Sequence, residues 1–347
     1  KNLESSIPGV PGFESVVGAL DFPGNDPGIT FNDFSPRIGA TYDVTGDGKT
    51  VIRGNFGKYY DALNNAFISY NNPTFVYNGA ILSYTNLDGD RVVDPNEITS
   101  APGYYGGLNG PVFDLNAFAN SRKISSDLQN SSAYEYLVGF ERQLSTDLSV
   151  GATYTHRDYR DPISIVPNGV SAADFVPGGT FTANTVLGSF NVPYFIYGGV
   201  DDGDQILLNA HDYKTKYDGV DLTVRKRMSN NFLVNGGLTL QKQKANYDGG
   251  DSLAFYIGDG GLTGQVFPFD PTNLPFLNDH PYAFAPGGSG KSGVYPYSEW
   301  QVKLSGVYQF PWDISAGAFA RYQQGYPYVL FGTLTDGSLQ SALGTDT

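Results

Sequence analysis

The sequence predicts an all-β fold: a transmembrane antiparallel up-and-down β-barrel wall with short turns at one end and long loops at the other. Segments of about ten residues alternate apolar and polar side chains, which is the length and pattern of strands that cross a bilayer at about 45°. The segments come in pairs joined by tight polar turns, and very long connections separate the pairs. The composition favours strands too, with 25 tyrosines and 23 phenylalanines against two tryptophans.

The first two predicted hairpins occupy residues 34–60 and 133–157. The turn of the first, at 45–49, contains Asp47-Gly48, a strong hairpin signal. The turn of the second lies at 145–147. Their apolar sides, which we expect to face lipid, are Ile38, Ala40, Tyr42, Ile52, Phe56, Tyr134, Tyr136, Val138, Phe140, Leu148, Val150, Ala152 and Tyr154.

The third and fourth predicted hairpins occupy residues 217–244 and 298–322. Their turns fall at 228–231 and at Pro311-Trp312. The same alternation marks their apolar sides, which include Val220, Leu222, Val224, Phe232, Val234, Leu238, Leu240, Trp300, Val302, Leu304, Tyr308, Ile314, Ala316, Ala318 and Ala320.

Charged side chains occupy the opposite side of these strands, where water in a barrel lumen can solvate them. The lumen-facing candidates are Arg37, Arg53, Glu135, Arg225, Lys303 and Arg321. Ion-pair networks explain such charges more simply than contacts with a ligand. Aromatic residues cluster at the ends of the apolar sides, as in the interfacial girdle of a barrel; they include Tyr134, Tyr154, Trp300, Phe310, Trp312 and Tyr322.

Long connections of roughly 61–132, 158–216 and 245–297 hold most of the prolines and much of the acidic excess. Loops of this length are usually functional or disordered. In outer-membrane barrels the long loops face outside and the short turns face the periplasm, so we expect these segments to form an extracellular mouth. The alternative is a soluble all-β sandwich or barrel with the apolar side inward. Strands of soluble sandwiches more often have about 5–6 residues.

Composition excludes several classes of function. A net charge of −14 argues against nucleic acid as a partner, because nucleic-acid binding requires a basic surface. The 347 residues include no cysteine, which excludes disulfides and thiolate metal sites. The chain has three histidines, His156, His211 and His280. No pattern of nucleophile, base and acid stands out, so an enzyme is not expected. The mean hydropathy of −0.26 is uninformative, since a barrel strand exposes only every second side chain to lipid.

Several segments resemble the barrel of Oar-like TonB-dependent outer-membrane receptors, in order and spacing across most of the chain. They are 35–43 (SPRIGATYD), 45–54 (TGDGKTVIRG), 57–61 (GKYYD), 135–142 (EYLVGFER), 217–227 (YDGVDLTVRKR), 310–312 (FPW) and 325–328 (GYPY). The three segments within 35–61 are together fairly specific, whereas each later segment alone is generic for barrels.

The resemblance implies that residues 1–347 form part of a barrel of about 22 strands. It also implies uptake of a scarce ligand, energised by TonB through an N-terminal plug and TonB box, neither of which is visible in this sequence. The ends, with 8–12 reading PGVPG, are loop-like, so we expect a mature chain lacking both ends or an internal fragment. The alternative is a structural or adhesive outer-membrane protein that acts through its loops, as part of a larger surface assembly.

One loop has the ligand spacing of an EF-hand calcium site. Oxygen donors fall at positions 1, 3, 5, 7 (a backbone carbonyl), 9 and 12, namely Asn86, Asp88, Asp90, Val92, Asp94 and Glu97. Position 6 is Arg91 rather than glycine. The sequence predicts Ca²⁺ as the one candidate cofactor; the alternative is a solvated acidic turn.

Overall fold

The computed structural model describes most of the chain. The described residues are 4–16, 18–22, 24, 26, 28–61, 70, 79–99, 103–105, 122–185, 188–199, 204–211, 213–247, 266–267, 280–281 and 298–325. Nearly all regular structure among them is β, interrupted by short 3-10 turns such as η2 (Ala172–Asp174) and η4 (Pro311–Asp313). None of the helical segments in these ranges has the length and apolar character to span a bilayer.

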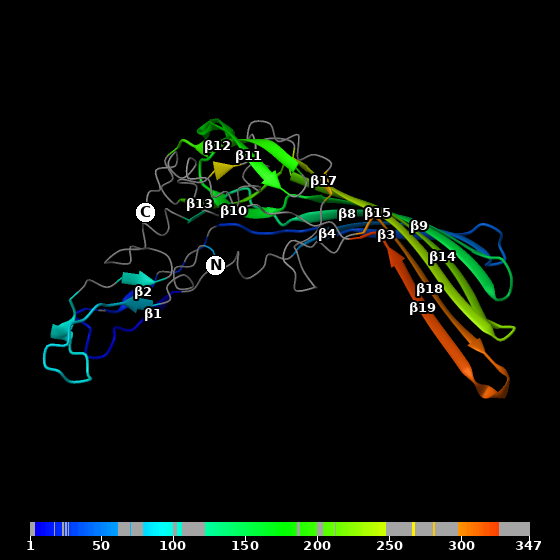
Figure 1. The fold of residues 1–347 in the computed structure, drawn as a ribbon, viewed down its shortest axis with the longest axis horizontal. Helices are drawn as coiled ribbons and strands as arrows, with labels where there is room; N and C mark the ends of the chain where they lie inside the picture. Colours follow the sequence, from blue (N-terminus) through cyan, green and yellow to red (C-terminus); the bar gives the residue numbers. More distant parts are fainter. Residues whose placement is uncertain are drawn as a thin grey trace.

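The main sheet is antiparallel throughout, and its strands follow one another in chain order (Figure 1). The order is β3-β4-β8-β9-β14-β15-β18-β19, and the two-residue β17 (His280–Pro281) also pairs with β15. In Figure 1 the short turns gather at one end of the sheet, and the smaller sheets lie at the other. The strands are β3 (Arg37–Asp43), β4 (Thr50–Tyr60), β8 (Ser132–Gln143), β9 (Leu148–Arg160), β14 (Tyr213–Ser229), β15 (Phe232–Tyr247), β18 (Trp300–Gln309) and β19 (Ser315–Gln323).

Local chemistry fixes each short turn. The Asp43 carboxylate accepts hydrogen bonds from the backbone N–H groups of Gly46 at 3.0 Å and Gly48 at 2.7 Å, and both glycines have positive φ. Asn230 and Asn231 have φ of 48° and 66°, the left-handed pair that a two-residue hairpin turn requires. The β14–β15 turn is therefore tighter than the sequence suggested, since β14 continues to Ser229.

The register assigns the two sides of the sheet row by row. One row runs across all eight strands through residues that lie directly opposite each other and are all apolar: Tyr42, Ile52, Phe140, Ala152, Leu222, Leu238, Val302 and Tyr322. The row one residue away is polar or glycine throughout: Thr41, Arg53, Gly139, Thr153, Asp221, Thr239, Gln301 and Gln323. A one-residue step changes the side of a strand, so two uniform rows define an apolar face and a polar face.

The apolar face is exposed rather than covered. Ile38 is 70 % exposed, Val138 57 % and Leu304 51 %. A soluble sandwich would bury this face against a second sheet, because its core lies between the two inner faces. Among the described residues, the most deeply buried apolar side chains instead lie beyond the loop end of the sheet, as with Val166 and Leu207.

The predicted long loops contain strands of their own. The connection 158–216 includes β10 (Ile163–Pro167), β11 (Phe175–Thr185), β12 (Gly188–Tyr197) and β13 (Gln205–Asn209). β13 joins β10 to β7 (Arg122–Ile124) from the preceding connection, and β12 pairs with β16 (Val266–Phe267) from the following one. The remaining short pairs are β1 (Ser5–Ile7) with β2 (Leu20–Phe22), and β5 (Gly79–Ile81) with β6 (Gly103–Tyr105).

The described base of these loops is held by a buried amide. Asn209 is 4 % exposed; its Oδ1 accepts from the backbone N–H of Gln129 at 2.8 Å. Its Nδ2 donates to the carbonyl oxygens of Gln129 at 2.9 Å and Asp161 at 2.8 Å. Because buried polar groups must be hydrogen-bonded, this side chain links two connections that the sequence separates by 80 residues.

Candidate functional site

The polar face carries two ion pairs between neighbouring strands. The Arg53 guanidinium lies 2.5 Å from the Glu141 carboxylate, and Arg157 donates through Nε to Glu135 at 2.5 Å. The Arg157 guanidinium also lies 5.7 Å from the centroid of the Tyr217 ring. Two of the six predicted lumen-facing residues, Arg53 and Glu135, are thus part of such pairs.

The other four predicted residues have different surroundings. The Arg37 guanidinium stacks over the Tyr59 ring at 4.7 Å. Arg225 lies between Ser149 and Asn235 in the register, while Lys303 and Arg321 lie directly opposite each other and are both exposed. The polar face therefore combines balanced pairs over β4, β8 and β9 with a cationic region over β18 and β19.

Sequence reasoning missed the partners Glu141 and Arg157 as site residues. Both continue the same two-residue alternation as Glu135, so the period alone could have placed them on the polar face. It could not have paired them, because the register between strands decides which side chains meet.

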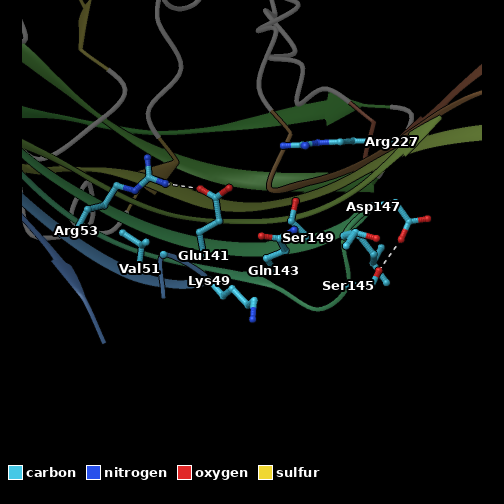
Figure 2. Close-up of a pocket in the computed structure, with 12 residues that line it drawn as sticks. Lys49, Val51, Arg53, Glu141, Gln143, Ser145, Asp147, Ser149 and Arg227 are labelled. Carbon is cyan, nitrogen blue, oxygen red and sulfur yellow. Dashed lines mark hydrogen bonds and ion pairs between the residues drawn. The ribbon is translucent and has the colours of Figure 1, made fainter. Parts of the chain in front are cut away.

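A pocket of about 290 Å³ lies at the turn end of the polar face (Figure 2). In Figure 2 Arg53 points toward Glu141, and Ser145 lies beside Asp147. Hydrogen bonds from Ser145, then from Ser229 and Lys226, hold the pKa of the Asp147 carboxyl well below its ordinary value of 3.8. The pocket lining is mostly charged or hydroxyl-bearing and includes Lys49, Arg53, Glu141, Gln143, Ser145, Asp147, Ser149 and Arg227.

A second pocket, of about 420 Å³, lies at the loop end of the same strands. Its lining differs in character, with four tyrosines, an aspartate and an arginine among its residues: Tyr59, Tyr60, Asp61, Tyr159, Arg160 and Tyr213. Aromatic walls with a few convergent polar groups are typical of sites for small molecules.

The predicted calcium loop folds as a compact turn. Glu97 is 1 % exposed and accepts hydrogen bonds from the backbone N–H groups of Leu87 at 2.6 Å and Asp94 at 3.1 Å. The Asp88 and Asp90 carboxylates accept from the backbone N–H groups of Asp90 at 3.0 Å and Val92 at 2.8 Å, respectively. The Asn86 amide spans the loop, accepting from Gly89 N–H and donating to the Asp90 carbonyl oxygen, both at 2.6 Å.

Four of the six predicted ligand residues, Asn86, Asp88, Asp90 and Glu97, thus use side-chain oxygens to accept hydrogen bonds from backbone N–H groups of the loop. Within the described ranges, no three His, Cys, Asp or Glu side chains are grouped so that they could hold a metal ion. Calcium binding here stays a prediction.

The two-faced strands, short turns and long loops are those of an outer-membrane barrel. The chain belongs to the outer membrane beta barrel domain family, whose family model matches residues 17–274. The predicted all-β barrel fold is confirmed, and the soluble alternative is wrong. In an outer-membrane barrel the apolar face contacts lipid and the polar face lines the interior.

Several solved structures are similar to this chain over most of its length. The outer membrane transporter YddB from Escherichia coli matches with a TM-score of 0.40 and 11 % identity, over 87 % of this chain and 30 % of that one. The siderophore receptor PirA from Pseudomonas aeruginosa matches with 0.36 and 13 %, over 85 % and 34 %. The FrpB iron transporter from Neisseria meningitidis matches with 0.38 and 8 %, over 84 % and 26 %. The chain thus spans about a third or less of the length of these proteins. A search of curated proteins finds no match.

Proposed function

We propose that this chain is part of the barrel of a TonB-dependent outer-membrane receptor that imports a scarce extracellular ligand. The observation that carries the proposal is the continuous polar face across eight strands whose sheet stays open. Within the described residues, β3 pairs only with β4 and β19 only with β18. An open edge in lipid leaves backbone groups without partners, so further strands must complete the wall.

A wall of more than eight strands encloses a wide interior. Barrels of 16–18 strands leave an aqueous channel, and those of about 22 strands hold a plug. The ion pairs on the polar face are compatible with an aqueous channel and with a plugged barrel, because the charges stay solvated or paired in both. The resemblance to Oar-like receptors favours the larger, plugged barrel, with the long loops outside and the turns in the periplasm.

The aromatic pocket at the loop end is the proposed entry site for the ligand. Tyr59 and Tyr159 both belong to the polar face, in one register row with Ala133 and Thr215. The pocket therefore opens where an extracellular ligand would meet the barrel mouth. The proposed role is binding and transport rather than catalysis.

The direct test is physical association with TonB. The full-length protein in lipid nanodiscs should bind the purified periplasmic domain of TonB. Cells that depend on the ligand should grow better with the protein than without it, and deleting TonB should abolish this growth advantage. Tyr59→Ala with Tyr159→Ala should reduce ligand uptake, whereas Tyr42→Ala on the lipid face should not. Absence of TonB binding, together with uptake that persists without TonB, would contradict the proposal.

A second function is favoured by the structured loops. The β10-β13-β7 sheet and the β11-β12-β16 sheet give the loop end of the protein a surface with regular secondary structure. A structural or adhesive protein in a larger surface assembly would require such a surface. Cross-linking on intact cells separates the two. A stable protein partner at the loops, with no TonB dependence, supports the assembly role.

A further inference from the structure

β19 forms one edge of the main sheet and carries an arginine on its polar side. In Figure 1 β19 lies at the margin of the sheet, and within the described residues it pairs only with β18. Arg321 of β19 lies directly opposite Lys303 of β18, and both side chains are exposed. Like charges directly opposite each other on a sheet are destabilising, so a carboxylate close to this pair would stabilise the wall.

The strands on either side of β18 do not supply that carboxylate. On the polar face, no direct or diagonal neighbour of Lys303 is acidic, and neither is any such neighbour of Arg321 on β18. These neighbours all belong to the described part of the wall; they are Asn235, Gly237 and Thr239 on β15, Gln301 and Ser305 on β18, and Phe319 and Gln323 on β19. The register positions that remain for a carboxylate beside Arg321 are therefore those beyond the edge of β19.

Elsewhere on the same face, two arginines meet carboxylates of the adjacent strand. Arg157 of β9 lies directly opposite Glu135 of β8 in the register, and Arg157 Nε is 2.5 Å from a Glu135 carboxylate oxygen. Arg53 of β4 is diagonal to Glu141 of β8, and the two side chains are again 2.5 Å apart. The wall thus neutralises these arginines across neighbouring strands, at direct and diagonal positions that long side chains can reach.

Arg225 differs from Arg321 because no like charge lies opposite it. Its register partners are Ser149 on β9 and Asn235 on β15, which are both neutral. Water in the barrel interior can solvate a single cation of this kind. The pair of Arg321 and Lys303 instead places two like charges face to face, and a carboxylate on the open side of β19 would offset them.

A further strand must cover the edge of β19, because backbone groups without partners are unfavourable in lipid. We propose that the strand pairing with this edge presents an aspartate or glutamate to Arg321, at the direct or diagonal position on the polar face. The same strand has apolar side chains opposite Ala320 and Tyr322, which lie on the lipid-facing side of β19. This pairing rests on the proposed function only in that the wall continues, and it needs neither TonB nor a ligand.

The first test compares the two opposed cations in the full-length protein, by urea titration of the barrel in lipid vesicles. Arg321→Gln should lower the folding equilibrium constant about two-fold to five-fold, because it removes the ion pair with the neighbouring strand. The matched control Lys303→Gln removes the like charge and keeps that ion pair, so it should leave the equilibrium constant unchanged or raise it. If Arg321 has no partner beyond the edge, both variants relieve the same repulsion and neither lowers the equilibrium constant, which would overturn the proposal.

A second measurement detects the partner in the native protein. Solid-state NMR of the full-length barrel in lipid, with labelled arginine nitrogens and labelled aspartate and glutamate carbons, should show a carboxylate carbon within about 4 Å of the Arg321 guanidinium. Arg321→Lys removes that signal and so assigns it. Contacts between backbone amides of β19 and the neighbouring strand show separately whether the wall continues. A continuing wall whose strand holds no carboxylate near Arg321 overturns this inference and leaves the proposed function intact, whereas a β19 edge without a neighbouring strand contradicts both.

Discussion

A lysine in the middle of the apolar face should strongly destabilise the protein, whereas a lysine at the next residue should not. Leu222 lies in the apolar row that crosses all eight strands, and its side chain is 41 % exposed on the apolar face. Thr223 follows it on the polar face, opposite Gly151 and Gly237. The pair Leu222→Lys and Thr223→Lys introduces the same charge one residue apart.

The expected magnitude follows from depth in the bilayer. On this face of β14, Asp218 and Lys226 are the nearest charged residues, each four positions from Leu222. At about 3.3 Å per residue and a tilt of about 45°, each lies about 9 Å from Leu222 along the bilayer normal. Leu222 is thus close to the midplane, where a lysine costs about 2–4 kcal/mol in a barrel. That is roughly a thirty-fold to several-hundred-fold loss in the folding equilibrium.

The assay is reversible folding of the full-length protein into lipid vesicles, followed by urea titration and by the heat-dependent mobility of the folded barrel on gels. Thr223→Lys should change the free energy of unfolding by about 0.5 kcal/mol or less, as exposed substitutions usually do. Equal destabilisation by both variants, or a larger effect at Thr223, would refute the assignment of the two faces.

Further predictions concern packing, pH and calcium. A Cβ added at Gly139 would lie 2.8 Å from Cγ of Arg53, so Gly139→Ala should cost about 1 kcal/mol in urea titrations, whereas Gly54→Ala, with open space around it, should cost nothing. Because folding lowers the pKa of Asp147, its carboxylate contributes fully to the free energy of unfolding at pH values above the ordinary pKa of 3.8, and this contribution is lost as the pH falls below that value. Asp147→Asn should therefore remove the acid-dependent part of the urea midpoint. Calcium should bind with a dissociation constant of about 0.1–1 mM in calorimetry, as in extracellular modules, and Asp90→Ala should abolish the heat; no heat with the native protein would show that the acidic loop is a solvated turn.

Much of the fold could be predicted from the sequence because strand alternation is a local property. Tyr136, Val138 and Phe140 predict one side of β8 without knowledge of its neighbours, and the register places all three on the apolar face. The turn chemistry at Asp47-Gly48 likewise predicted the first hairpin. The strands within the connection 158–216 were missed, since β10 and β13 depend on each other and on the distant β7 for their hydrogen bonds.

The candidate site was predictable only in part. The period placed Arg53 and Glu135 on the polar side, but Arg53 and Glu141 are 88 residues apart, and their contact depends on the pairing of β4 with β8. The aromatic pocket combines Tyr59, Tyr159 and Tyr213 from three strands, and their spacing along the chain does not predict that they meet.

The sequence by itself determined that this protein is a two-faced β-barrel wall, because a period of two assigns each side chain to lipid or interior before any strand finds a partner. The tertiary structure decided which charges neutralise each other and where the pockets open. Those properties arise from the register between strands and from the folding of distant connections onto one end of the sheet, and neither is encoded in a local pattern.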